Sequence, residues 1–334
     1  MHEEAIDMNS SFVPPSISVD VDRLGLYGEI HGCFQRMKPE DDPVWTRGVP
    51  RFLELLEDLG IRASFFLVGD DLHPHRVGGL VARKRRELVR EIVARGHEVG
   101  SHSQAHDYRL SRRDRDTIER DLVSARAILE ECGASVDGFR APGYCLSTKL
   151  IEAAKTTGAL YSSSRLPSAA YFGAKYMAMM LGLLRCRTSA SIMGDVRAPL
   201  TSCTPYEHPC GLLELPIGVV TGLRIPLVGT LLTLFGEQGV RWLLPRVARR
   251  PWVHLEFHAT DLLDRDDIPS AYRGLPQPDL AQSVTCKRSV FEHWLTGLGA
   301  HLASSRLVDL AHAMRADRML EPGVKTRVGA VALP

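Results

Sequence analysis

Hydrophobic residues recur along the chain at two spacings, and each spacing predicts a different element. Short apolar runs, several of them alternating with polar residues, are typical of strands. The sequence has such runs at residues 17–22, 62–68, 98–101, 137–140, 160–164, 212–215 and 252–258. Apolar residues at helical spacing, each set ended by a glycine, predict helices over residues 49–59, 87–95 and 114–131.

The predicted strands and helices alternate, which argues for a parallel sheet with helices outside it. A closed α/β barrel is the natural form of such a chain, and the chemistry of these barrels sits at the C-terminal ends of the strands. A single barrel of this size is ordinary. We therefore expect a loose N-terminal leader over residues 1–15, one barrel over 16–315 and a C-terminal tail over 316–334.

Composition and charge narrow the functional classes. The formal net charge is +1 over 334 residues, so the charge of the whole chain does not indicate a nucleic-acid partner. The seven cysteines are scattered, with no Cys-x-x-Cys pair, which fits reduced thiols in a reducing compartment. The first 15 residues carry acids where a secretory signal needs basic residues. We expect a cytoplasmic location, and these features indicate no protein partner.

Two aspartates share one face of the first predicted strand. Alternation along residues 17–22 places Ile17, Val19 and Val21 on the face that would meet the helices. Asp20 and Asp22 lie on the opposite face and would point into the barrel. Two neighbouring buried carboxylates need a metal, a cationic partner or a raised pKa. The alternative is a solvated acidic pair in a turn.

A histidine pair directly follows the predicted strand at 98–101. His102 and His106 are four residues apart, so both rings reach one metal if the loop begins a helical turn. Together with Asp22 they make a three-ligand site with an open position for water, as catalytic metals require. The sequence thus predicts one divalent metal ion, with Zn²⁺ the first choice and Co²⁺, Mn²⁺ or Ni²⁺ as alternatives.

The segment Arg140-Ala-Pro-Gly-Tyr144 stands where another strand should end. The planar guanidinium of Arg140 suits a carboxylate. Pro142 and Gly143 would set a tight turn that directs the N–H group of Gly143 or Tyr144 into the site, where it would stabilise an oxyanion. Read alone, the segment is equally compatible with an ordinary loop.

The last predicted strand carries two histidines and a glutamate on one face. Alternation places His254, Glu256 and His258 together, with His258 last, at the catalytic end. A histidine with an unperturbed pKa near ~6.5 suits a general acid. His254 lies deeper and is expected to be a hydrogen-bonded core residue. Glu256, or Asp261 in the following loop, would orient His258 or pair with another buried group.

Taken together, these segments resemble the polysaccharide deacetylase family, also called carbohydrate esterase family 4 or the NodB homology domain. Its ordered motifs are an aspartate pair after the first strand, His-x-x-x-His, Arg-x-Pro and a late strand ending in histidine. This sequence has Asp20/Asp22, His102/His106, Arg140-Ala-Pro142 and His258 in that order. The resemblance implies a distorted (β/α)7-type barrel of parallel strands with helices outside, and a metal-dependent hydrolase that removes an N-acyl group from a sugar.

The resemblance also implies roles, and the sequence departs from the family pattern at two places. We assign Asp20 as the general base and Asp22 as the metal ligand, although Val21 separates acids that are adjacent in the family, so an exchange of the two roles is an alternative. The family's aspartate-tryptophan motif is not evident. Glu214-Leu-Pro216 occupies roughly its place, which leaves open which group orients His258.

A looser resemblance within the family concerns the deformylases of lipid-linked formamido-arabinose. It lies in Ser18–Asp22, Gly48–Pro50, Ile61–Asp70 and His258–Asp261. It implies an N-acetylated or N-formylated sugar or glycolipid as the substrate and peripheral contact with the inner face of the membrane. The alternatives are a non-sugar amide hydrolase of the allantoinase-like type and a catalytically inactive sugar-binding relative.

Two apolar stretches agree with a membrane setting. Residues 176–184 and 219–235 are too short or too interrupted to span a bilayer. We expect an exposed apolar ledge beside the site that holds a lipid-carried substrate, with core packing as the alternative. The basic residues expected to meet lipid phosphate are Arg185, Arg187, Arg241 and Arg246.

Overall fold

Eight strands form one sheet in the computed structural model. The structure describes residues 14–32, 37–184, 189–190, 192, 195, 198–220, 222, 224–302 and 305–320. The strand order is β10-β1-β2-β3-β4-β5-β7-β6, and all neighbours pair in parallel except β6 and β7. The strands are β1 (Ser16–Val21), β2 (Ser64–Leu67), β3 (Glu98–Ser101), β4 (Gly138–Phe139), β5 (Tyr161–Ser162), β6 (Tyr206–Glu207), β7 (Leu213–Glu214) and β10 (His254–His258). Each of the predicted strands is found, most of them shorter than expected.

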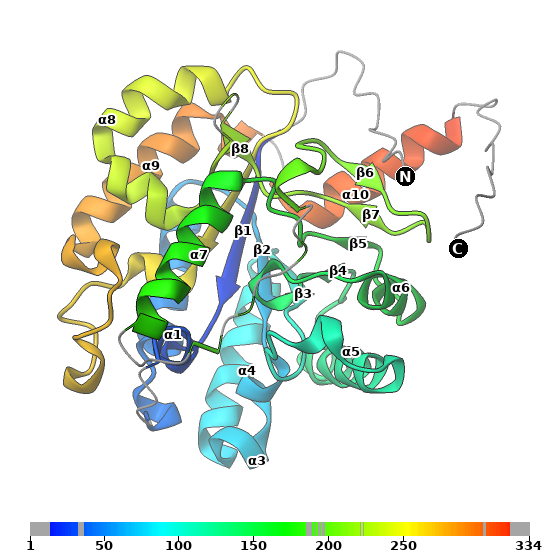
Figure 1. Cartoon of the computed structure of the whole chain (residues 1–334), viewed down its shortest axis with the longest axis horizontal. Helices are drawn as coiled ribbons and strands as arrows, with labels where there is room; N and C mark the ends of the chain where they lie inside the picture. Colours follow the sequence, from blue (N-terminus) through cyan, green and yellow to red (C-terminus); the bar gives the residue numbers. More distant parts are fainter. Residues whose placement is uncertain are drawn as a thin grey trace.

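Helices surround this sheet, and a small hairpin of β8 (Val219–Val220) and β9 (Ile225–Pro226) lies beside it (Figure 1). The helices are α1 (Leu24–Ile30), α2 (Val49–Asp58), α3 (Pro74–Val77), α4 (Gly79–Ala94), α5 (Arg115–Glu130), α6 (Thr148–Thr156), α7 (Ala169–Leu184), α8 (Gly229–Val247), α9 (Val284–Gly297) and α10 (Leu307–Leu320). The predicted parallel α/β architecture is confirmed. The expected N-terminal leader lies outside the described residues up to residue 13, and α10 continues five residues past the expected domain end at 315.

The sheet curls into a half-barrel rather than a closed barrel. Among the described strands, β10 and β6 form the two edges and do not pair with each other. The strands from β4 to β7 have only two residues each, and β6 runs antiparallel to its neighbour. Ladders this short cannot continue the curvature that closes a barrel, because closure needs a consistent stagger between every pair of strands.

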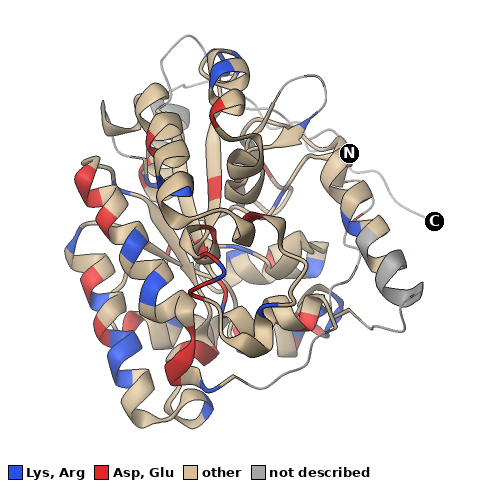
Figure 2. Cartoon of the chain, turned by 90° about the vertical axis from the view of Figure 1, so that its left-hand side faces the viewer, with Lys and Arg blue, Asp and Glu red and all other residues tan. Residues whose placement is uncertain are grey.

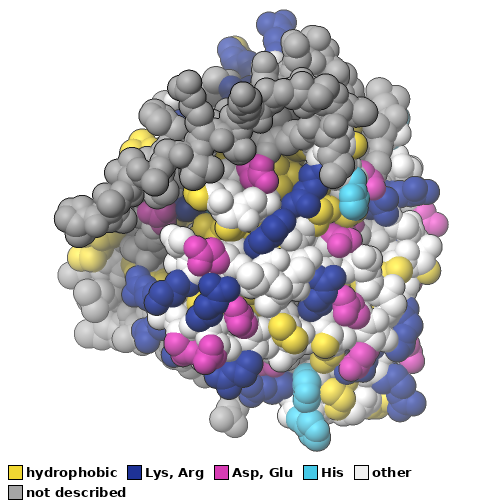
Figure 3. All heavy atoms as spheres, turned by 90° about the vertical axis from the view of Figure 1, so that its right-hand side faces the viewer, with side chains coloured by type: hydrophobic (Ala, Val, Ile, Leu, Met, Phe, Trp, Pro, Cys, Tyr) yellow, Lys and Arg dark blue, Asp and Glu magenta, His cyan; other side chains and the backbone are white. Residues whose placement is uncertain are grey.

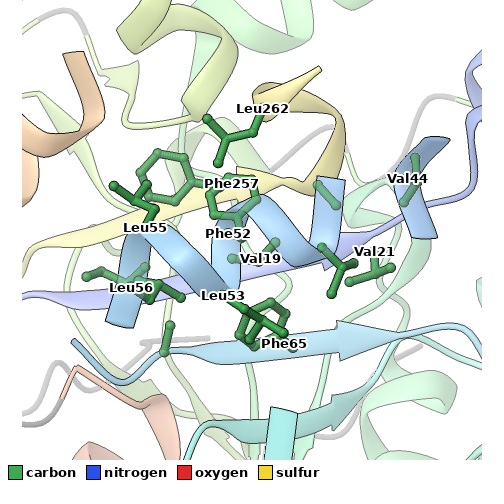
Figure 4. Close-up of a cluster of buried hydrophobic side chains, with 14 of the residues drawn as sticks. Val19, Val21, Val44, Phe52, Leu53, Leu55, Leu56, Phe65, Phe257 and Leu262 are labelled. Carbon is green, nitrogen blue, oxygen red and sulfur yellow. The ribbon is translucent and has the colours of Figure 1, made fainter. Parts of the chain in front are cut away.

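The outward face of the long strands is packed against helices. Val19 and Val21 of β1 and Phe257 of β10 lie in one buried cluster with Phe52 and Leu55 of α2 (Figure 4). This is the side that alternation predicted, since the odd-numbered residues of β1 are apolar. The opposite face of β1 is therefore turned inwards, which places its aspartates inside the half-barrel.

The N-terminal end of the half-barrel is closed by polar contacts to α10. Glu98 of β3 is buried and accepts hydrogen bonds from Ser64 Oγ, from Tyr161 Oη at 2.6 Å and from the Val308 N–H at 3.0 Å. The Ser64 hydroxyl oxygen in turn accepts from the Leu307 N–H at 2.8 Å. With this end filled, the carboxyl ends of the strands are the open end of the sheet.

Charged side chains of both signs are spread over the outer helices on the faces shown in Figures 2 and 3. Many of them pair locally, as in the contact of Arg115 with Glu119 on α5 at 2.7 Å.

A buried histidine beside β3 makes the stability of the fold depend on pH. His97 is 6% exposed, accepts a hydrogen bond from the Ala63 N–H and packs edge-on against Phe65. Burial, with the positive charges of Arg95, Arg62 and Arg306, lowers the pKa of His97 to about 4. The unfolded chain therefore takes up this proton first as the pH falls, so the stabilisation is complete above about pH 6.5 and is lost towards pH 4.

We expect His97→Asn to remove this dependence, because asparagine keeps an acceptor for the Ala63 N–H but does not titrate. Urea unfolding at pH 7 and pH 5 should show wild type losing about 2 kcal/mol more than the variant between the two values. Equal losses in both proteins would show that His97 does not carry a lowered pKa in the folded state.

Candidate active site

Five neighbouring parallel strands, β10, β1, β2, β3 and β4, meet at the open end of the half-barrel. The register of β1 against β10 sets Asp20 directly beside His258, and β1 against β2 sets Asp20 beside Phe66. Asp22 follows β1, and His102 and His106 follow β3. Arg140 follows β4. These residues are far apart in sequence and lie together because parallel strands end at the same edge.

Asp22, His102 and His106 converge on one point. The Nε2 atoms of His102 and His106 each lie 3.4 Å from Asp22 Oδ1, and all three side chains are buried. His102 is oriented by its Nδ1, which lies 2.9 Å from the Arg140 carbonyl oxygen. A ligand histidine is usually held in this way by a carbonyl or carboxylate on its other nitrogen.

The histidines converge through a strained turn, not through the helical turn expected from their spacing. Ser103 and His106 have positive φ angles of 67° and 54°. The His106 N–H donates to Ser103 Oγ, and the carboxylate of Asp121 accepts the N–H groups of Gln104 and Ala105. Left-handed backbone at a non-glycine residue is costly and persists where the surroundings impose it, often at functional sites.

The residues present fit a divalent metal ion. Asp22 Oδ1 and both ring nitrogens of His106 are buried and have no hydrogen-bond partner within the described residues. Burial lowers the pKa of His102, and burial with the charge of Arg23 lowers that of His106 to about 3, so both imidazoles are neutral, as metal binding requires. Donors bound at about 2.1 Å in a tetrahedral site lie roughly 3.4 Å apart, which matches the observed spacing.

Arg140 is the central cation of the site. It is fully buried, with its Nη1 2.5 Å from Asp20 Oδ1, and it donates from Nε and Nη2 to the carbonyl and hydroxyl oxygens of Ser163. Its guanidinium also stacks over the Phe66 ring at 4.1 Å. Burial alone would raise the pKa of Asp20, but the charge of Arg140, followed by His102 and His258, holds it below its usual value.

Glu256 is a second buried carboxyl group next to Arg140. Its Oε1 accepts from Tyr144 Oη at 2.9 Å and from Arg140 Nη1 at 3.3 Å. Its Oε2 has no partner among the described residues, and a carboxylate oxygen lies within 4.8 Å of ligand atoms of Asp20 and His258. Burial, opposed by Arg140 and reinforced by repulsion from Asp20, raises the pKa of Glu256 to about 8.

His258 is the half-buried histidine at the end of β10. Burial alone would lower its pKa, but the carboxylates of Asp20, Glu256 and Asp22 raise it to about 9. Asp261 Oδ2 accepts the backbone N–H of His258 at 2.7 Å, and the Tyr27 ring lies edge-on to the imidazole. Asp261 thus holds the backbone of His258, while Glu256 faces its ring from the same strand.

Two further candidate groups, the Tyr144 N–H and the Glu214 carboxylate, are already hydrogen-bonded within the protein. The Tyr144 N–H donates to the Ala141 carbonyl at 3.1 Å, which leaves the N–H of Gly143 as the candidate oxyanion donor of this turn. Glu214 does not reach His258; it accepts the N–H groups of Ser164 and Arg165 and lies 3.0 Å from His208 Nε2. It therefore anchors the chain after β5.

Several residues of the site carried no recognised sequence signal. Ser163 holds Arg140, Phe66 supports the guanidinium face, and Tyr108 packs edge-on against His106 with ring centroids 4.9 Å apart. Ser163 lies in a run of three serines at the end of a predicted strand, which is the one signal that could have indicated it. Phe66 looks like any core residue of a strand.

Fold and site together define an α/β half-barrel protein with an aspartate–histidine centre at its strand ends. Comparison with known proteins shows what this chain is similar to: residues 40–162 match the family model for polysaccharide deacetylase. The matched segment includes His102, His106 and Arg140, whereas Asp20, Asp22 and His258 lie outside it and join them through the strand register.

Curated relatives match over part of their length. The chain is 28% identical over 117 residues to a peptidoglycan-N-acetylglucosamine deacetylase of Bacillus cereus, covering 35% of this chain and 48% of the relative. It is 37% identical over 103 residues to a chitooligosaccharide deacetylase of Sinorhizobium fredii, covering 30% and 41%. The chain thus spans less than half the length of these relatives.

Solved structures show the same fold over nearly the whole chain. A Mycobacterium smegmatis protein assigned as a polysaccharide deacetylase superposes with a TM-score of 0.57 at 17% identity, covering 99% of both chains. An allantoinase superposes with a TM-score of 0.54 at 16% identity, covering 92% of both. At these identities the likeness concerns the fold alone, and it does not separate sugar from non-sugar substrates.

Proposed function

We propose that this protein is a metal-dependent hydrolase that removes an N-acetyl or N-formyl group from an amino sugar. The observation that carries the proposal is the buried set Asp22, His102 and His106, with Asp20 and His258 next to each other at the same strand ends. The match of residues 40–162 to the polysaccharide deacetylase family model supports a sugar as the substrate.

A bound divalent ion, Zn²⁺ by donor chemistry, would polarise the acyl carbonyl and lower the pKa of a coordinated water towards ~7. Asp22, His102 and His106 would hold it. Asp20, kept ionised by Arg140, takes the proton of the attacking water. Its second oxygen lies 3.8 Å from His102 Nε2, so the base faces the same point as the ligands.

The other residues would act on the tetrahedral adduct, as its oxyanion develops and as its carbon–nitrogen bond breaks. The N–H of Gly143 would stabilise the developing oxyanion. His258, charged because of the surrounding carboxylates, delivers a proton to the departing amine. Glu256 and Asp261 position His258, the first beside its ring and the second through its backbone N–H. The products are a free amino sugar and acetate or formate.

The direct test is to incubate the protein, loaded with Zn²⁺ or Co²⁺, with N-acetyl sugars, N-formyl sugars, lipid-linked sugars and allantoin. Mass spectrometry of the released acid and of the amine product identifies the substrate class. Release from sugars supports the proposal. Turnover of allantoin alone would replace it with a non-sugar amide hydrolase, and sugar binding without any release would indicate an inactive relative.

A lipid-linked substrate is the finer version of this proposal. On α7, Tyr176 is 51% and Met177 57% exposed, and on α8 Trp242 is 65% exposed. The stretch 219–235 was expected to be an exposed ledge, but most of its described residues up to Thr233 are buried or half-buried. Its exposed apolar surface is at its end, at Leu234 and Phe235. Arg185 and Arg187 lie outside the described residues.

The outer side of α8 has the composition of a membrane-interface surface. Trp242 lies between the exposed Arg241 and Arg246 along the helix. Aromatic side chains with arginines suit the headgroup region of an anionic bilayer. Within the described residues, no helix has the length and apolar character needed to cross a membrane. The surface would therefore act by peripheral contact.

We expect the protein to co-sediment with vesicles containing phosphatidylserine, and less so at high salt. Replacing Arg241 and Arg246 by glutamine should weaken this binding by about 5-fold per arginine, since each contributes about 1 kcal/mol near an anionic surface. Arg83→Gln, an exposed arginine on α4, is the matched control. Wild-type protein that stays in the supernatant at low salt would exclude membrane contact through this surface.

A further inference from the structure

A lysine beside the candidate active site has no carboxylate partner among the described residues. Lys175 of α7 is half-buried, and its Nζ lies 3.4 Å from the Gly143 carbonyl oxygen. Among the described residues no carboxylate lies within ion-pair distance of it. The internal residues that the structure does not describe include no aspartate or glutamate. They are residues 33–36, 185–188, 191, 193–194, 196–197, 221, 223 and 303–304.

Cys145, the ionisable group that acts on the charge of Lys175, does not supply a counter-charge. Burial raises the pKa of the Cys145 thiol, so this group is neutral near pH 7. Burial also lowers the pKa of Lys175. A partly desolvated ammonium without an opposite charge is costly. Lys175 carries this cost on a helix next to the open site. This arrangement indicates that an anion from outside the protein pairs with its ammonium group.

Gly143 and Tyr108 lie between Lys175 and the candidate metal ligand His106. A Cβ atom built on Gly143 would fall 2.7 Å from the Tyr108 ring and 3.7 Å from Lys175 Nζ, and the Tyr108 ring packs against His106. Gly143 and Tyr108 thus separate the ammonium from the centre. The Tyr171 ring of α7 packs edge-on against Tyr144. The helix forms a wall of the site.

The overall charge of the site favours an anion at this place. A divalent ion would balance Asp20 and Asp22, which leaves Arg140, His258 and Lys175 as positive groups around the bound sugar. Arg140 is buried and fully used by Asp20, Glu256 and Ser163. His258 is the proposed proton donor to the departing amine, so Lys175 is the cation of this set that remains for an anionic group on the substrate.

We propose that Lys175 binds an oxyanion substituent, a phosphate or a carboxylate, carried by the acylated sugar. This specificity rests on the proposed sugar deacylation at the same site. The ammonium would donate to the substituent in place of its long contact with the Gly143 carbonyl. A lysine acts here as a point charge, which suits either anion.

The test compares four substrates: neutral N-acetylglucosamine, its 1-phosphate, its 6-phosphate and N-acetylmuramic acid. We expect at least one anionic sugar to be preferred by kcat/KM, chiefly through KM, and Lys175→Met to lower kcat/KM for that sugar by about 10- to 100-fold. The neutral sugar should change little. Lys175→Arg should keep part of the preference, and Lys155→Met, a half-buried lysine at the far end of α6, should keep all of it.

Binding to metal-free protein separates this proposal from the proposed function. Calorimetry with the preferred anionic sugar should show binding to wild type that weakens with salt and is lost in Lys175→Met. If no sugar is turned over, the preferred sugar is taken as the tightest binder of the four. Equal binding of all four sugars, or an equal effect of Lys175→Met on each, would overturn the role of Lys175 even if deacylation is confirmed. Lack of acid release with Lys175-dependent binding would instead refute the enzymatic reaction and keep the anion site.

Discussion

Replacement of Asp20 by asparagine is expected to lower kcat by about 10²- to 10⁴-fold, the usual contribution of general-base catalysis. Asparagine has nearly the same shape and still accepts a hydrogen bond from Arg140, but it cannot take a proton from water. The variant should retain its metal, because Asp22, His102 and His106 hold it. Turnover under saturating substrate and metal content by elemental analysis are the two measurements.

The control for Asp20→Asn is Asp267→Asn. Asp267 is also a shielded carboxylate held by arginines, with Arg47 Nη1 at 2.6 Å and Arg51 in contact, but it lies outside the strand-end site. Its replacement should leave kcat unchanged. Near-normal turnover in Asp20→Asn would mean that Asp22 or another group is the base, and loss of metal in that variant would show that Asp20 is a ligand.

Replacement of His102 by alanine is expected to reduce the metal content from about one ion per chain to near zero. Two donors remain, and the imidazole held by the Arg140 carbonyl is lost. Turnover should fall by about 10³-fold or more, because a bound metal supplies several kcal/mol of transition-state stabilisation. Elemental analysis after dialysis and the rate with added Zn²⁺ measure the two effects.

The matched control is His208→Ala, which removes another buried imidazole paired with a carboxylate, that of Glu214. It should keep the metal. Thermal unfolding of both variants shows whether each is folded under the conditions of the assay. Full metal occupancy in folded His102→Ala would refute the assignment of Asp22, His102 and His106 as the ligand set.

Short-range patterns predicted the elements and the faces of the long strands. Residues 98–101 form a strand with the predicted bounds, and alternation in 17–22 and 252–258 correctly separated the packed face from the inward face. His254, expected as a hydrogen-bonded core residue, is fully buried and lies 2.9 Å from Ser18 Oγ. These features follow from one strand at a time, because side-chain direction repeats every two residues.

The local backbone between the histidines could not be predicted in the same way. A spacing of four suggests a helical turn, yet Ser103 and His106 adopt left-handed angles. The contacts that impose this turn come from the helix α5, through Asp121, and from Ser103 itself. Such conformations depend on tertiary contacts that outweigh the intrinsic preference of each residue.

By itself, then, the sequence determined which segments become strands and helices, which face of each long strand is inward, and that acids, histidines and an arginine stand at strand ends. Only the tertiary structure decided that Ser163 and Phe66 hold Arg140, that Glu256 lies beside Asp20 and His258, that the sheet stays open, and that Lys175 lies over Gly143. The reason is physical: periodicity acts within a segment, whereas these contacts join side chains from separate segments whose distance is set by strand order and register.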